Sequence, residues 1–303
     1  MPSKLVKRGS IVVSVLLVVI AAAAAGGYVA SEKVITAKVT VPVEQVAVPT
    51  DSLSIERGRH LATAISKCVD CHGQDFGGQL VMDAPPIGHI GGPNLTRGKG
   101  GIGAQLKDED YVRAVRHAVA RDGHKIPMMP SSEYNAMSTE DLGALIAFLK
   151  QVPPVDRASP PVEYGPVGRG LIAAGKLPMF TAEVIDHAKP APATSPMPGP
   201  NATYGRYLAN IGGCTGCHGP TLAGGRILQG PPDWPPAANL TPTGMKSYDE
   251  ASFMKTLRTG VRPSGVALNP AMPWKMAGQM TDDEIRAVWE YLKSIPPREF
   301  GAR

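Results

Sequence analysis

The pattern Cys-x-x-Cys-His occurs twice in this chain, and the two copies contain every cysteine that the chain has. The first copy is residues 68–72 (CVDCH) and the second is residues 214–218 (CTGCH), 146 positions later. A chain whose only cysteines are arranged in this way is expected to build the same site twice. Any fold of this chain must therefore present the motif twice.

Cys-x-x-Cys-His is the attachment motif of c-type haem, in which both thiols bond to one porphyrin and the histidine ligates its iron. We therefore predict two covalently bound haem c groups. The predicted cysteine attachments and histidine ligands are Cys68, Cys71 and His72 for one haem, and Cys214, Cys217 and His218 for the other. A disulfide, a redox dithiol or a four-cysteine zinc site would use the same cysteines, but none of these requires the histidine.

The sequence around the motif repeats as well, which predicts two tandem modules. Asn94 and Asn239 are 145 positions apart, and Met129 and Met272 are 143 apart. Each module is expected to be mainly helical. The expected helices cover residues 56–66, 108–120 and 138 onward in the first module, and residues 204–211, 249–259 and 281 onward in the second.

The last helix of each module has a start signal. Ser138 and Thr281 are each followed three residues later by an acid, Asp141 or Glu284, in the pattern of a capping box. Proline ends both helices, and their apolar residues recur at helical spacing.

A second axial ligand is expected for each iron, and a methionine thioether is typical of electron-transfer haem. Only Met129 and Met272 are followed by proline and lie nine residues before the predicted cap. We therefore predict these two as axial ligands, and assign Met137 and Met280, beside the caps, to the core. The other five histidines have no ligating counterpart in the other copy, and we expect them to be solvated or hydrogen-bonded: His60, His89, His117, His124 and His187.

The N-terminus combines three basic residues, Lys4, Lys7 and Arg8, with an uncharged run from Ser10 to Ser31. This predicts a retained signal anchor, with a cleaved signal peptide as the alternative. The positive-inside rule places the basic end in the cytoplasm and the rest of the chain on the periplasmic side of a bacterial inner membrane. The expected organisation is an anchor helix (1–30), a tether (31–50), a first haem domain (51–152), a Pro-rich linker (153–200) and a second haem domain (201–303).

The charge balance argues against nucleic acid as a partner. The net charge is +5, and the anchor supplies three of these charges, which leaves 28 basic and 26 acidic side chains in the remainder. A mixed solvated surface accounts for this composition.

With these residues in view, the chain resembles the class I c-type cytochromes. It is most similar to the two-haem and three-haem cytochrome subunits of bacterial membrane-bound alcohol and aldehyde dehydrogenases. The shared stretches include GPNLT and MMPSSEYNAMSTEDLGALIAFLK in the first module, and ANLT and MTDDEIRAVWEYLK in the second. The resemblance implies an all-α fold of two tandem class I cytochrome c domains, with the two end helices of each domain crossing behind the haem.

The function expected from these features is a membrane-anchored dihaem cytochrome, which is not itself an enzyme. It would relay electrons from a dehydrogenase or quinol-linked complex to a respiratory acceptor. One alternative is a dihaem cytochrome c peroxidase, which needs a haem with an open position. Another is the cytochrome subunit of a terminal oxidase complex.

Overall fold

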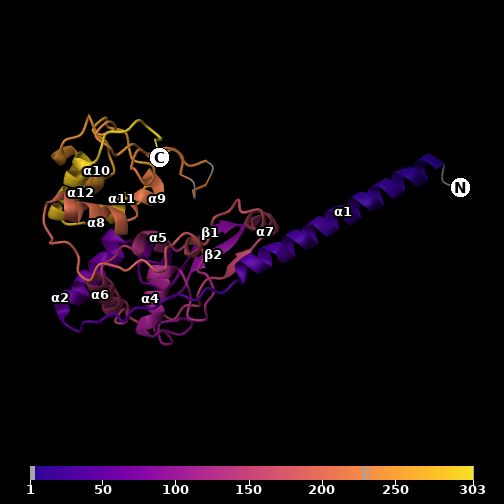
Figure 1. The fold of residues 1–303 in the computed structure, drawn as a ribbon, viewed down its shortest axis with the longest axis horizontal. Helices are drawn as coiled ribbons and strands as arrows, with labels where there is room; N and C mark the ends of the chain where they lie inside the picture. The colour runs from indigo at the N-terminus through magenta and orange to yellow at the C-terminus, as the bar shows by residue number, and fades with distance from the viewer. Residues whose placement is uncertain (1–3, 228–229, 232, 303) are drawn as a thin grey trace.

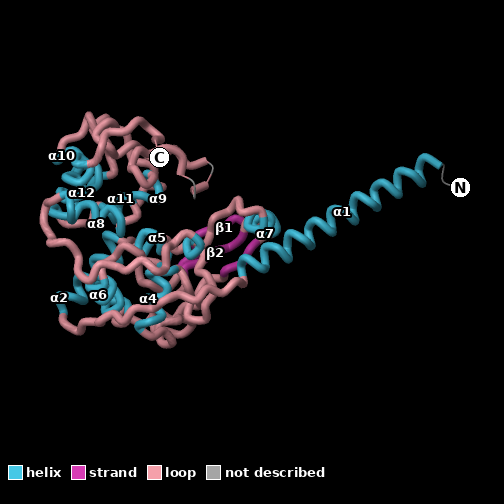
Figure 2. The backbone as a smooth tube through the Cα atoms, viewed as in Figure 1, coloured by secondary structure: helices cyan, strands magenta, loops and turns pink. Residues whose placement is uncertain are grey.

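The computed structural model describes residues 4–227, 230–231 and 233–302. One long helix, α1 (Lys4–Ile35), projects from a globular part that contains both copies of the Cys-x-x-Cys-His motif (Figure 1). Residues 1–3 of the predicted anchor lie outside the described residues. Helices are the main regular secondary structure of the globular part, which also has long connecting loops and a small sheet near the base of α1 (Figure 2).

The two modules contain the same helices in the same order. The first module has α2 (Ser52–His60) continuing into a π-helical turn (Leu61–Ile65), then α3 (Val69–His72), α4 (Asp108–His117), α5 (Ser131–Tyr134) and α6 (Thr139–Leu149). The second has α8 (Ala202–Ile211), α9 (Cys214–His218), α10 (Glu250–Thr259), α11 (Trp274–Ala277) and α12 (Asp282–Ser294). The long helices lie where the sequence predicts them, and the short α5 and α11 follow the two Met-Pro pairs.

In each module the first and last helices cross closely, and a glycine makes the crossing possible. A Cβ atom on Gly58 of α2 would lie 1.9 Å from the carbonyl oxygen of Ala144 in α6. A Cβ atom on Gly205 of α8 would lie 1.8 Å from the carbonyl oxygen of Ala287 in α12. Any larger side chain would therefore push the two helices apart, and both modules depend on the same crossing.

The fold departs from the all-α prediction in one region. Strands β1 (Gln79–Ala84), β2 (Gly88–Gly92) and β3 (Val162–Tyr164) form an antiparallel sheet in the order β1-β2-β3. Ile90 of β2 pairs with Met82 on one side and Val162 on the other. The helical pattern of the sequence does not predict this sheet, because β3 comes from the Pro-rich segment and is only three residues long.

The Pro-rich segment between the modules also carries α7 (Pro166–Ala173) and a 3-10 turn (Thr181–Glu183). Ile172, Met179 and Phe180 from this segment join Ile90 in a small apolar cluster, against which Val34 and Ile35 of α1 also pack. The segment therefore connects the base of α1 to the sheet.

Residues 36–50, between α1 and α2, run along the surface of the first module. The backbone N–H of Val39 donates to the carbonyl oxygen of Gly123, and Glu44 forms an ion pair with Arg116 at 2.6 Å. A Cβ atom on Gly143 in α6 would lie 2.2 Å from the carbonyl oxygen of Ala47. These contacts fasten the segment to the module along most of its length.

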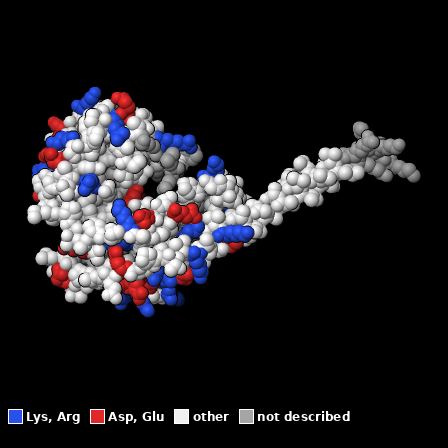
Figure 3. Space-filling model, in the orientation of Figure 1, with Lys and Arg blue, Asp and Glu red and all other residues white. Residues whose placement is uncertain are grey.

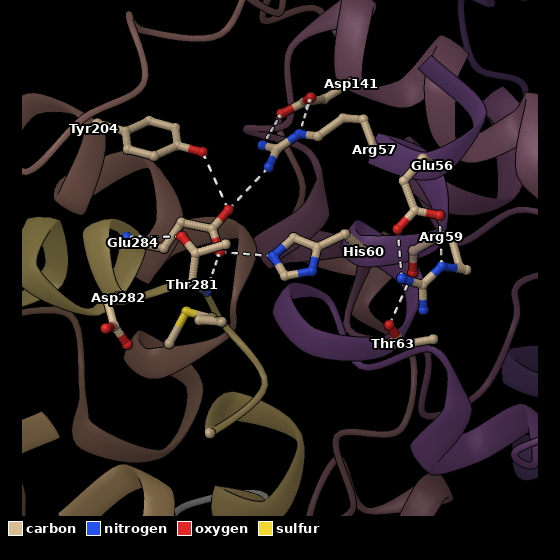
Figure 4. Close-up of polar contacts among 12 residues, drawn as sticks. Glu56, Arg57, Arg59, His60, Thr63, Asp141, Tyr204, Thr281, Asp282 and Glu284 are labelled. Atoms are coloured by element: carbon tan, nitrogen blue, oxygen red, sulfur yellow. Dashed lines mark hydrogen bonds and ion pairs between the residues drawn. The ribbon is translucent and has the colours of Figure 1, made fainter. Parts of the chain in front are cut away.

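The two modules share one continuous hydrophobic core. Beside this core lies a polar cluster that joins them, centred on Arg57 of α2 (Figure 4). The Arg57 guanidinium donates two hydrogen bonds of 3.0 Å to the carboxylate of Asp141 in its own module and one of 3.1 Å to Glu284 in the other. His60 lies 2.6 Å from Glu284, and Tyr207 donates to Asp141 at 2.6 Å.

The cluster has an approximate two-fold pattern, because its members occupy matching positions of the repeat. Asp141 and Glu284 are the acids of the two predicted helix caps. Glu284 completes a capping box with Thr281, whereas the carboxylate of Asp141 is taken by Arg57 and Tyr207. Burial opposes the charge on Arg57, but its hydrogen bonds to Asp141 and the nearby charges of Asp141 and Glu284 together outweigh this and raise its pKa.

We expect Arg57→Ala to lower the free energy of unfolding by about 2–4 kcal/mol, because both carboxylates would stay buried without their cation. Arg59→Ala is the matched control on the same helix, since Arg59 forms an exposed pair with Glu56 and should cost less than about 1 kcal/mol. Urea unfolding of the full chain measures both values, and equal costs for the two variants would contradict the prediction.

Candidate haem sites

The first motif lies on a single helical turn. Cys68 caps α3, and its carbonyl oxygen accepts from the N–H of Cys71 at 3.2 Å and of His72 at 2.9 Å. The residue before it, Lys67, has a φ of +52° and turns the chain sharply out of the preceding π-helical turn. The motif thus stands on its own short helix at an angle to α2.

The second motif is built in the same way. Cys214 begins α9, and Gly213 before it adopts a left-handed conformation with φ of +73°. Gly213 is the counterpart of Lys67, so both copies use a left-handed residue immediately before the first cysteine. The matching backbone explains how two modules with different loops present the motif alike.

The four thiols are free, and burial raises the pKa of each of them. For Cys68 the pKa rises to about 12, and for Cys71 to about 11. A reactive redox dithiol is favoured by a lowered thiol pKa, and burial here acts in the opposite direction. Among the described residues, no group of three or more His, Cys, Asp or Glu side chains is arranged to hold a metal ion. The geometry therefore favours neither of these alternatives.

Each motif histidine is oriented by a backbone carbonyl. His72 Nδ1 lies 2.9 Å from the carbonyl oxygen of Pro93, and His218 Nδ1 lies 2.7 Å from that of Ala238. Burial lowers the pKa of both imidazoles, which favours their neutral form. A neutral imidazole that donates through Nδ1 keeps a lone pair on Nε2, as an iron ligand requires.

The residue after each carbonyl is a buried asparagine that holds the loop in place. The Asn94 amide donates to the carbonyl oxygens of Val155 and Arg157 at 2.8 Å, and that of Asn239 donates to Arg298 at 2.8 Å. The sequence shows these asparagines only as landmarks of the repeat. Their structural role is to fix the carbonyl that orients the histidine.

The predicted methionine ligands lie at the start of matching loops. Met129 and Met272 are partly buried, pack against the shared core, and are each followed by the proline that caps α5 or α11. Met128, beside Met129, has φ of +59° and is 38% exposed. Met137 and Met280 are buried in the core, as expected for the residues beside the helix caps.

Two arginines that the sequence analysis did not single out hold the methionine loops. Arg116 of α4 donates through Nη1 to the carbonyl oxygen of Asn135 at 3.1 Å and also to that of Met137. Arg258 of α10 donates to the carbonyl oxygens of Gly278 and, at 2.7 Å, Met280. Their signal in the sequence was the repeated arginine of RAVRHAV and KTLRTGV.

The remaining histidines have partners elsewhere. His60 contacts Glu284, His89 contacts Asp83, and His124 contacts Asp122. His117 and His187 lie against each other with their Nδ1 atoms 3.0 Å apart. These contacts account for all five without a ligating role.

The segments that precede the two motifs contact each other directly. Ser66 donates through its hydroxyl to the carbonyl oxygen of Ile211 at 3.1 Å. Lys67 Nζ donates to the carbonyl oxygens of Ile65, at 2.8 Å, and Gly212. These contacts bring residues 65–67 of the first module against residues 211–212 of the second.

Glu133 of α5 strengthens this contact by reaching from the first methionine loop to the second motif. Its carboxylate accepts from the N–H of Gly216, and a Cβ atom on Gly213 or Gly216 would lie within about 2 Å of a Glu133 oxygen. Burial raises the pKa of Glu133 to about 7, although Lys67 and the Gly216 N–H oppose the rise. The two candidate sites therefore share a boundary formed by chain from both modules.

Comparison with known proteins agrees with this duplicated architecture. The model of the family described as Cytochrome c matches residues 55–153 and again residues 202–296. The chain belongs to the cytochrome c family. Cytochrome c domains imply covalently bound haem c.

Relatives of this cytochrome include subunits of bacterial dehydrogenases. It is 32% identical over 276 residues to the gluconate 2-dehydrogenase cytochrome c subunit of Pantoea cypripedii, covering 81% of the chain and 60% of that protein. It is 30% identical over 279 residues to the alcohol dehydrogenase (quinone) cytochrome c subunit of Gluconacetobacter polyoxogenes, covering 82% and 57%. A diheme cytochrome c-type protein of Cereibacter sphaeroides is 28% identical over 207 residues, covering 63% and 66%. The chain thus spans a little over half the length of the dehydrogenase subunits.

We expect Glu133 to contribute stability that is lost as the pH rises through the range from about 4.5 to 7. In this range the folded chain keeps a proton on Glu133 that the unfolded chain has released, so each rise in pH favours unfolding. The effect amounts to at most about 3 kcal/mol. Glu133→Gln should remove this part of the slope in urea-unfolding curves measured at several pH values.

The exposed carboxylate of Glu109 provides the control variant, Glu109→Gln. If Glu133→Gln leaves the slope as steep as the control does, the titrating group lies elsewhere.

Proposed function

We propose that this protein is a membrane-anchored dihaem cytochrome that relays electrons on the extracytoplasmic side of a bacterial membrane. The observation that carries the proposal is the contact between residues 65–67 and residues 211–212, directly before the two Cys-x-x-Cys-His motifs. Two redox sites that share such a boundary suit transfer from one to the other inside one chain.

The residues present fit two haem c groups. Cys68 and Cys71 would hold the first group and His72 and Met129 would ligate its iron. Cys214, Cys217, His218 and Met272 would do the same for the second. The free thiols, the carbonyl-oriented imidazoles and the Met-Pro loops all match this use. When bound, haem supplies a one-electron ferrous–ferric couple.

The protein's own groups would keep both irons closed to substrate. Arg116 and Arg258 hold the methionine loops, and Asn94 and Asn239 hold the opposite loops. A site fixed on both sides needs little rearrangement when it gains or loses an electron. This favours electron transfer over the peroxidase alternative, which requires a ligand position that opens.

Membrane anchoring is supported by α1. Its stretch Ile11–Ile35 is long and apolar enough to cross a bilayer, and most of α1 projects away from the globular part (Figure 1). With Lys4, Lys7 and Arg8 on the cytoplasmic side, both modules would lie on the opposite, periplasmic side. The contacts of α1 with α7 and the sheet favour a retained anchor over a cleaved signal peptide.

The proposed electron donor is a membrane-associated dehydrogenase, and the acceptor is another component of the respiratory chain. The support is the similarity to cytochrome subunits of gluconate and alcohol dehydrogenases. Partner subunits recovered by gentle detergent purification of the native complex would identify the donor.

The purified full chain should contain two haem c per polypeptide by the pyridine haemochrome assay. It should give low-spin spectra in both oxidation states and two one-electron waves in a redox titration. Rapid peroxide turnover together with a high-spin signal in one oxidation state would contradict the relay and favour the peroxidase.

Met129→His should lower the midpoint potential of one wave by a few tenths of a volt, within the roughly 0.8 V range that axial ligands span, and leave the other wave nearly unchanged. The reason is that an imidazole stabilises ferric iron better than a thioether does. Met128→Leu is the matched control, because it replaces the adjacent methionine, whose φ is +59°, with another apolar side chain. A potential that moves in the control and not in Met129→His would assign the ligand to Met128.

A further inference from the structure

Besides the apolar contacts of Val34 and Ile35, one arginine of α7 links that helix to the base of α1. Arg169 donates through Nη1 to the carboxylate of Glu32 at 2.7 Å and to the hydroxyl of Ser31 at 3.2 Å. Its guanidinium also lies 4.3 Å from the centre of the Tyr28 ring. These three partners lie on consecutive turns of α1, so they fix the height of α7 along the anchor helix (Figure 1).

That height corresponds to the surface of a bilayer. The hydrocarbon core is about 30 Å thick and takes about 20 residues of helix. Counted from Ile11, where the described apolar stretch begins, such a span ends near Ala30. Tyr28, Ser31 and Glu32 then lie at the boundary between lipid and water, where tyrosine is enriched. Because Arg169 contacts all three, α7 lies at the same depth.

The side of α7 that faces away from the protein is uncharged. Pro166, Val167, Gly170 and Ala174 are exposed there, and Val167 is 50% exposed. The turn between β1 and β2 extends this surface, since exposed Pro86 accepts from the backbone N–H of Val167 at 2.8 Å.

Charged side chains lie around this surface, outside the exposed face of α7. Lys33, which follows Glu32 in α1, and Lys176, just beyond α7, are both exposed. Asp83 of β1 is paired with His89, and Glu163 of β3 is exposed beside the sheet. Figure 3 shows that charges gather over the globular part and are absent along the outer length of α1 up to its grey end. An apolar face bordered by lysines suits the phospholipid headgroup region.

We propose that α7 and the Pro85–Pro86 turn rest in the headgroup region of the leaflet that α1 enters. This inference builds on the proposed membrane anchoring. The occupant is lipid, because the surface continues from the spanning helix at the depth where that helix leaves the hydrocarbon. Arg169 therefore acts as a clamp that sets the tilt of both modules relative to the membrane.

This position of α7 can be tested with the full chain in nanodiscs of phosphatidylethanolamine and phosphatidylglycerol. A hydrophobic carbene probe dissolved in the lipid is photoactivated, and the labelled peptides are identified by mass spectrometry. We expect labelling of α1 and of residues 165–176, and none at the exposed Ser247 region of the second module. An unlabelled α1 would refute the anchoring itself. A labelled α1 with an unlabelled α7 would overturn only the proposed contact of α7 with the headgroup region.

A matched pair of variants separates lipid contact from adventitious probe binding. A side chain at Gly170 would meet open space, so both Gly170→Glu and Gly170→Gln are compatible with the fold. We expect the charged variant to reduce α7 labelling several-fold while α1 labelling stays constant, and the neutral variant to keep most of it. Equal labelling of α7 in both variants would overturn the proposal, and the haem absorbance spectrum checks that both are folded.

Discussion

The close contact between the two modules holds the globular part together. It combines a shared apolar core with a buried charged cluster in which Arg57 bridges Asp141 and Glu284. Removing two carboxylates from water is costly unless a cation and hydrogen-bond donors replace the solvent. The cluster provides both, and its partners come from the two modules, so neither module satisfies its own helix-end acid entirely alone.

This arrangement follows from duplication. Arg57 and Tyr204 are counterparts, as are His60 and Tyr207, and each pair is directed at the same two acids. In an exact repeat both copies would carry the same side chain. Here one copy supplies the cation and the imidazole while the other supplies two phenols. The two phenols donate hydrogen bonds to the same carboxylates, Tyr204 to Glu284 at 3.4 Å and Tyr207 to Asp141 at 2.6 Å.

Much of this fold could be predicted from the sequence because the signals were local and occurred twice. The capping patterns at Ser138 and Thr281 and the apolar periodicity after them predict helices that the structure contains. The sheet could not be predicted in the same way. It joins β3 to strands more than 70 residues earlier, and its pairing depends on tertiary contacts rather than on any repeated pattern.

In the candidate sites, too, the residues with local sequence signals could be predicted and those that act through tertiary contacts could not. The motif cysteines, histidines and Met-Pro pairs are recognisable by type and spacing, and their assignment as haem ligands stays a prediction. The carbonyls of Pro93 and Ala238 carry no side-chain signal, because backbone atoms are the same in every residue. Glu133 could not be predicted from the sequence either, since its carboxylate acts by packing against Gly213 and Gly216 of the other module. Glycine at these two positions leaves the space that the carboxylate occupies, so the second motif is shaped partly by a residue of the first module.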